Sequence, residues 1–187
     1  MTFRAAGVAA ALALCAPAFA GEAALQGQKD IVLHTRDGKA IVLGRVTFAP
    51  QGAGVTFRVD WDDRKFTVHF LSMREFKCVE GEEILCQIPY PYGNPKQVTL
   101  ENLSWLDHAL LFFYKRPSDY GAKLAQGLIF PLKPVSGALE GAAESIDLDE
   151  IASPPEDRTK PYYDAERRTK IEPGARWAQR LSLEDHR

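Results

Sequence analysis

The chain has 187 residues, of which 45% are hydrophobic and 26% charged, with 23 basic and 25 acidic residues. This length and apolar content are sufficient for one domain with a substantial core, and the nearly balanced charge disfavours general nucleic-acid binding. The sequence contains no nucleotide-binding loop, nucleophile elbow or zinc-binding spacing. It therefore indicates no cofactor and no class of enzyme.

The first segment, residues 1–20, has the three parts of a secretory signal peptide. A short basic start with Arg4 precedes an alanine-rich apolar run, and Ala-Phe-Ala at 18–20 matches an A-x-A cleavage site. The apolar run is too short for a membrane-spanning helix. We expect cleavage after residue 20, export to a bacterial periplasm and no transmembrane segment in the mature chain. A lipoprotein box ending at Cys15 is a minor alternative, because Leu14 stands where a small residue is required.

Cysteine usage fits this compartment. Of the three cysteines, Cys15 leaves with the leader, and Cys78 and Cys86 remain. An even pair in an oxidising compartment predicts one disulfide, and the spacing matches neither a C-x-x-C redox motif nor a zinc site. Gly81, inside the loop that the disulfide closes, is expected to supply a positive φ.

Four segments in the first half alternate apolar and polar residues with a period of two, which predicts β-strands. Asp37-Gly38, between the first two, is typical of a tight hairpin turn. In the fourth, we expect Phe66, Val68 and Phe70 on the buried face of a half-buried strand. The first half is thus predicted to be an antiparallel meander over residues 31–35, 40–48, 55–61 and 65–71.

Residues 98–114 permit two interpretations. An S-x-x-D capping pattern that begins at Ser104 predicts a helix, whereas the aromatic-rich run at 109–114 predicts a buried strand. We expect a short helical turn over 102–106 and then a strand over 108–114. A helix throughout the region is the alternative.

These segments together predict a mainly β fold, formally a β-rich α+β fold. Further strands at 127–132 and 138–148 complete about seven or eight antiparallel strands, accompanied by short helices. We expect a curved or barrel-like sheet that forms one domain over residues 21–151. The meander resembles the lipocalin-like barrels, although the G-x-W motif of that family's first strand is absent.

The composition changes after Ile151, where prolines and charges become frequent. Residues 152–187 are predicted to be a charged, proline-containing tail with a short helix that begins near Glu172. Trp177 and Leu181 lie on one face of that helix. The tail is expected either to dock through Trp177 or to remain mobile.

A candidate surface for a ligand or partner flanks the cysteine loop. Arg74, Phe76 and Lys77 interleave basic and aromatic side chains, and Tyr90 and Tyr92 lie in a stiff Pro-Tyr-Pro-Tyr segment. The favoured alternative for the two tyrosines is that they cover the open end of the sheet.

His69, Asp107 and His108 are the residues from which a metal site or a hydrolase centre could be assembled. No H-x-H or H-E-x-x-H spacing supports a metal, and scattered strand histidines are usually structural. We therefore expect no metal site. A hydrolase that uses these three residues stays open, because residues gathered from distant strands leave no local motif.

Three functional hypotheses follow. The leading hypothesis is a non-enzymatic periplasmic module that binds a small apolar ligand or another envelope component. The first alternative is an accessory or structural envelope protein that acts through protein–protein contacts of its Pro-Tyr segment and tail. The second alternative is the hydrolase built on Asp107, His108 and His69.

Overall fold

The computed structural model describes residues 24–52 and 54–186, so the expected leader and its cleavage site lie outside the described residues. Within these ranges the protein is mostly β, with two antiparallel sheets and only short helices. The mainly β, curved fold class expected from the sequence is thereby confirmed. No helix in the described ranges has the length and apolar content needed to cross a membrane.

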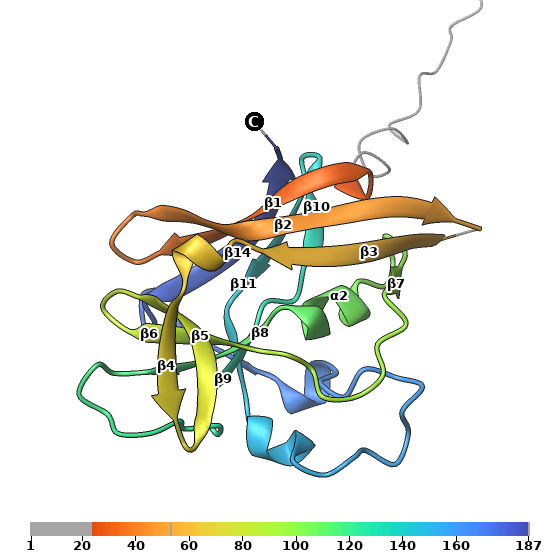
Figure 1. Cartoon of the computed structure of the whole chain (residues 1–187). Helices are drawn as coiled ribbons and strands as arrows, with labels where there is room; N and C mark the ends of the chain where they lie inside the picture. Colours follow the sequence, from red (N-terminus) through yellow and green to blue (C-terminus); the bar gives the residue numbers. More distant parts are fainter. Residues whose placement is uncertain (1–23, 53, 187) are drawn as a thin grey trace, which may run out of the picture.

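The strands are arranged in two sheets (Figure 1). Among the described residues, each sheet contains seven strands. Sheet A is formed, in spatial order, by β10 (Lys133–Val135), β11 (Ala138–Ala142), β14 (Ala178–Asp185), β1 (Gly27–Thr35), β2 (Ala40–Gln51), β3 (Gly54–Trp61) and β7 (Gln97–Val98). Sheet B is formed by β13 (Thr169–Lys170), β12 (Glu144–Ile146), β9 (Gly127–Ile129), β8 (Leu111–Lys115), β6 (Ile84–Ile88), β5 (Arg74–Glu80) and β4 (Thr67–Leu71). The helical elements are α2 (Ser104–Ala109) and the 3₁₀ turns η1 (Asp63–Lys65), η2 (Leu148–Ile151) and η3 (Ala165–Arg167).

The β1–β2 hairpin forms where the Asp-Gly turn predicts it, and Gly38 adopts a φ of 79°. Leu43 is the extra residue of a β-bulge in β2. The neighbouring Gly44 lies against β3, where an added Cβ would be 2.4 Å from the carbonyl oxygen of Asp60. The missing side chain therefore lets β2 and β3 approach each other beside the bulge.

The meander stops after three strands, because β4 pairs with β5 in sheet B and not with β3. η1 redirects the chain between them. Phe66 packs edge-on against Trp61, with ring centroids 5.7 Å apart. Val68 and Phe70, which were expected on the same buried face, are instead exposed to solvent.

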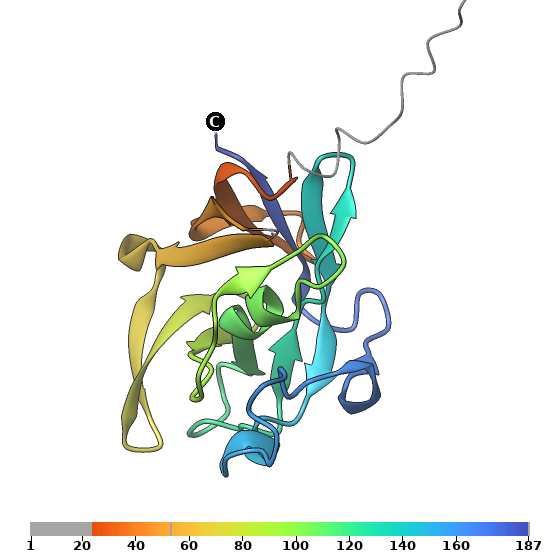
Figure 2. The same ribbon diagram turned by 90° about the vertical axis from the view of Figure 1, so that its right-hand side faces the viewer.

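Two extended stretches pass from one sheet to the other. The chain of β9 continues through Phe130 into β10, and that of β11 continues through Ala143 into β12. Gly141 lies at the crossing, where an added Cβ would be 2.7 Å from the Phe130 carbonyl carbon. The two sheets consequently curl around a shared core, as the second view shows (Figure 2).

β8 is buried on both faces and lies between two apolar clusters. Phe112 belongs to the main core between the sheets, whereas Leu111 and Phe113 belong to a second cluster on the opposite face of sheet B. α2 immediately precedes this strand, so the region 98–114 contains a helix and then a strand, as the first interpretation expected. The helix extends to Ala109, and the strand begins at Leu111.

The C-terminal segment is an integral part of sheet A. β14 pairs with β1 on one side and with β11 on the other, and Leu181 and Leu183 are buried in the main core. The helix expected from Glu172 onward is therefore wrong, because the alternation of Leu181 and Leu183 with polar residues specifies a strand. The described residues 152–186 supply an interior strand of sheet A and do not form a separate tail.

Candidate functional site

Both ring nitrogens of His108 are engaged in hydrogen bonds. Nδ1 lies 2.7 Å from the Ser104 carbonyl oxygen, and Nε2 accepts the backbone N–H of Tyr163 at 2.9 Å. These partners assign the ring proton to Nδ1. Burial lowers the pKa of His108 to about 4, so the imidazole is neutral at physiological pH. Neither nitrogen is available as a base or a metal ligand, and His108 instead connects α2 to the C-terminal segment.

Asp107 is also buried. Its Oδ1 accepts the backbone N–H of Leu132 at 3.1 Å, which connects α2 to the crossover that follows β9. Burial raises the pKa of this carboxyl group to about 8, and the hydrogen bond from the Leu132 N–H and the positive charge of Arg168 only partly oppose the shift. The side chain is therefore a neutral, hydrogen-bonded part of the core at pH 7.

His69 lies on β4, away from α2 (Figure 1). Its Nε2 is 2.7 Å from Oε1 of Glu80 on the neighbouring strand. The three residues considered for a hydrolase thus have separate partners, and the structure does not assemble them. Across residues 24–52 and 54–186, no group of three or more His, Cys, Asp or Glu side chains is arranged to hold a metal ion.

Cys78 and Cys86 are direct cross-strand partners on β5 and β6, and they form the expected disulfide. Gly81, in the loop between them, does not have the positive φ that we expected. It is required for space instead, because an added Cβ would lie 2.1 Å from Cζ2 of Trp177. The stapled loop is thus the surface on which the C-terminal segment docks.

The aromatic members of the candidate surface are packed. Phe76 lies edge-on to Phe113 with ring centroids 5.2 Å apart. Tyr90 packs edge-on against His108 at 5.1 Å, and Tyr92 donates its hydroxyl proton to the Ile151 carbonyl at 2.8 Å. These contacts favour the covering role for the tyrosines.

The two basic members, Arg74 and Lys77, are exposed on the β4–β5 hairpin. Lys77 pairs with Asp63 at 2.6 Å. The five residues of the candidate surface therefore do not present one common face. The aromatic side chains belong to the second apolar cluster, and the basic ones face solvent.

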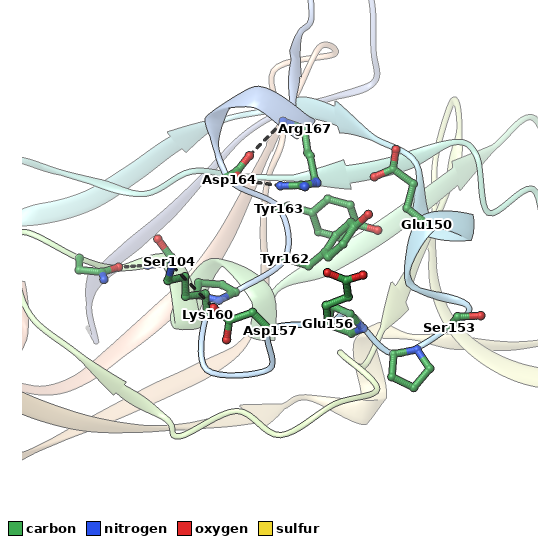
Figure 3. A pocket seen from close by; sticks show the side chains of 14 residues that line it. Ser104, Glu150, Ser153, Glu156, Asp157, Lys160, Tyr162, Tyr163, Asp164 and Arg167 are labelled. Atoms are coloured by element: carbon green, nitrogen blue, oxygen red, sulfur yellow. Dashed lines mark hydrogen bonds and ion pairs between the residues drawn. The ribbon is translucent and has the colours of Figure 1, made fainter.

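An open basin of about 850 Å³ lies between the start of α2 and the segment 150–167 (Figure 3). Its charged groups are largely paired, with Arg167 at 2.7 Å from Asp164 and Lys160 at 3.6 Å from Asp157. The Arg167 guanidinium also covers the Tyr162 ring, 4.8 Å from its centroid. The basin is thus an open depression with a mixed polar and apolar lining, in which the Arg167 guanidinium already covers the Tyr162 ring.

Sequence patterns did not identify the most exposed large apolar side chains among the described residues, which lie on the β4–β5 hairpin and in the loop beside it. Val68, Phe70 and Met73 are 60%, 72% and 88% exposed, and Tyr120 in the nearby loop is 99% exposed. The Ala122 N–H donates to Oγ of Ser72 at 3.1 Å, which ties that loop to the hairpin turn. We call the side chains of Val68, Phe70 and Met73 the hairpin patch. The sequence does show the alternating apolar residues of this strand. A strand with one apolar face normally buries that face, so the alternation predicted a core position and not an exposed surface.

The turn that carries this patch has an unusual backbone. Ser72 and Met73 have φ angles of 49° and 65°, and such a two-residue turn normally contains Asn-Gly. Holding a long apolar side chain in the left-handed region is unfavourable, and such strain occurs preferentially at functional positions. The turn keeps Met73 at the apex, where it has almost no contact with the rest of the chain.

Comparisons of the chain with protein-family models, with curated proteins and with solved structures found no match.

Proposed function

We propose that this protein is a non-enzymatic binding module of the bacterial cell envelope, and that the hairpin patch captures another envelope component. The observation that carries the proposal is the concentration of exposed apolar side chains at one end of one hairpin. Monomeric proteins seldom gather such residues without an interaction to cover them. Export is supported by the leader-like residues 1–20 and by the disulfide, which requires an oxidising compartment.

The other hypotheses receive less support from the described residues. Asp107 is held by Leu132 and His108 by Ser104 and Tyr163, which leaves no assembled acid–base pair for a hydrolase. The Pro-Tyr segment is packed, and the C-terminal segment is part of sheet A, so neither offers the free surface of an accessory protein. The basin is open and carries several charged side chains, so it does not enclose a small apolar ligand.

Site-specific photo-crosslinking in the periplasm tests the proposal. A photoreactive phenylalanine analogue at position 73 is expected to form a covalent adduct with an envelope component. The same analogue at Val135 provides the control, because this residue is also exposed and apolar but lies on β10 in the other sheet. Phe70→Ser should reduce the adduct formed from position 73 without unfolding the protein, because Phe70 has few contacts with the core.

Equal labelling from positions 73 and 135, or no adduct at position 73, would contradict a specific role for the hairpin patch. Circular dichroism and urea unfolding of each variant would establish that the fold is retained.

A further inference from the structure

The two sheets have four edge strands, and three of them carry features that discourage pairing with another chain. β7 and β13 have only two residues each, and β10 contains Lys133 and Pro134. Short length, lysine and proline are the usual protections of a sheet edge. β4 has none of them: its five residues, Thr-Val-His-Phe-Leu, include no lysine, proline or glycine. It is the unprotected edge among the described strands.

The hydrogen-bonding groups on this edge can be assigned from the hairpin register. Leu71 pairs with Arg74 across the two-residue turn, so these two residues exchange the first pair of backbone hydrogen bonds. The alternation of an antiparallel ladder then directs the N–H and C=O groups of Val68 and Phe70 away from β5. Figure 2 shows the hairpin, in yellow, standing away from the rest of the protein with this edge toward solvent.

We propose that β4 binds an extended segment of a partner protein, which adds to sheet B as an eighth strand. The inference rests on the proposed function and specifies how the hairpin patch is used. Val68 and Phe70 supply both the outward backbone groups and the exposed apolar side chains. A bound strand would satisfy the backbone groups, and its alternate apolar residues would extend the exposed face.

The charges at the ends of β4 indicate the chemistry of the partner. Lys65 precedes the strand and Arg74 lies at its far end, and neither forms an ion pair within the described part of the chain. Arg64 and Lys77 are neutralised by Asp62 and Asp63, and Glu80 lies against His69. Glu75, the cross-strand partner of Phe70, is a negative charge that opposes this positive potential near the middle of the hairpin. The segment that fits is therefore apolar in its centre and acidic at both ends.

A second copy of this chain fits less well. Antiparallel pairing of two β4 strands with full overlap would place His69 opposite its counterpart. Lys65 of each copy would then lie at the end of the strand where the other copy carries Arg74. These like charges oppose self-association and favour a partner of different sequence.

A proline substitution tests the strand-addition mode directly. Val68→Pro removes an N–H that points outward and is not used inside the hairpin, and proline is tolerated at such edge positions. Val68→Thr is the matched control, because it removes the apolar side chain but keeps the N–H. With the crosslinker at position 73, Val68→Pro should reduce the adduct roughly tenfold, because it removes one backbone hydrogen bond and adds a ring at the edge. Val68→Thr should retain most of the adduct.

A synthetic peptide supplies the test in solution. The probe alternates valine and threonine between two acidic ends, and its counterpart has lysine at both ends. Amide hydrogen exchange should show protection of Val68 and Phe70 with the acidic peptide and weaker protection at high salt. In Val68→Pro, which has no amide hydrogen at position 68, Phe70 should show no protection. Absence of protection at millimolar acidic peptide, or equal binding of the lysine-ended peptide, would overturn the inference.

The outcomes separate this inference from the proposed function. An adduct at position 73 that survives Val68→Pro would leave the hairpin patch as a docking surface but eliminate strand addition. An adduct with lipid in place of protein would assign the patch to the membrane surface and would also overturn strand addition. No adduct in any background would contradict the proposed function itself.

Discussion

The environment of Asp107 determines the protonation state of its carboxyl group. The group is buried beside α2, its Oδ1 accepts a backbone N–H, and its pKa is raised to about 8. His108, the next residue, is held neutral by the opposite shift to about 4. An acid with a raised pKa beside a base with a lowered pKa is an arrangement typical of active sites. Here, however, the hydrogen-bond partners are backbone groups of the same fold, and burial causes both shifts.

Asp107→Asn tests this account through the pH dependence of stability. The folded protein retains a proton that the unfolded chain releases above its pKa of about 4, so stability should fall as the pH rises from about 4 to about 8. Asparagine preserves the acceptor for the Leu132 N–H and does not titrate. The variant should therefore lose less stability than the wild type between pH 5 and pH 9, by at least about 1 kcal/mol in urea unfolding. Parallel pH profiles for the two proteins would contradict a buried, protonated carboxyl group.

Gly81 is required because of the residue that packs on it. The Trp177 ring occupies the space of a Cβ at this position, and its Nε1 donates to Asp37 at 3.0 Å while its backbone N–H donates to Glu83 at 2.9 Å. Trp177 is thus anchored through both its ring and its backbone, which restricts its movement away from Gly81.

Gly81→Ala is expected to destabilise the protein by about 1–3 kcal/mol, the usual cost of overpacking. Gly93→Ala is the control, because no atom lies within 4 Å of the added Cβ there. Thermal unfolding would compare the two variants. Equal melting temperatures would mean that Trp177 does not occupy this site.

At the level of elements, the cross-strand disulfide stabilises the β5–β6 hairpin and the surface on which Trp177 docks. Cys78 and Cys86 are fully buried and lie eight residues apart. The loop is short, so the chain-entropy contribution of the crosslink is moderate.

Replacement of both cysteines by alanine should lower the free energy of unfolding by about 2–3 kcal/mol from the crosslink alone. Urea unfolding of the oxidised wild type and the double variant would measure the difference. Unchanged stability would argue against a disulfide in the exported protein.

The β4–β5 hairpin shows how an element can be identified correctly and its orientation misassigned. The alternation of Phe66, Val68 and Phe70 predicted a strand, and β4 is one. Which face of a strand is buried depends on the sheet that receives it. η1 turns the chain before β4 and places it at the edge of sheet B, so Val68 and Phe70 face solvent. No local pattern distinguishes this arrangement from a fourth strand of the meander.

For the whole molecule, the position of β14 has the largest consequence. The strand lies between β1 and β11, so the last residues of the chain complete the centre of sheet A. A strand at that position contributes backbone hydrogen bonds on both sides and buries Leu181 and Leu183.

Truncation after Ile151 should therefore abolish cooperative folding. Removal of β14 would expose the core and take away one of the two strand partners of both β1 and β11, which would divide sheet A. Loss of the near-ultraviolet circular dichroism signal and of dispersed amide resonances would confirm this. A truncated chain with a cooperative unfolding transition would mean that residues 152–187 are a dispensable tail.

Local patterns in the chain were sufficient for the strand-rich class, the Asp-Gly hairpin, the helix and strand of residues 98–114 and the Cys78–Cys86 pair, because each depends on neighbouring residues or on a simple count. Other features depend on contacts between distant segments and left no local pattern. They are the assignment of β4 to sheet B, the docking of β14, the packing of Gly81 against Trp177, and the separation of His69 from Asp107 and His108. The hairpin patch belongs to this second group. An apolar side chain has the same sequence signature whether a core or a partner covers it, and only the arrangement of the two sheets leaves Val68, Phe70 and Met73 exposed.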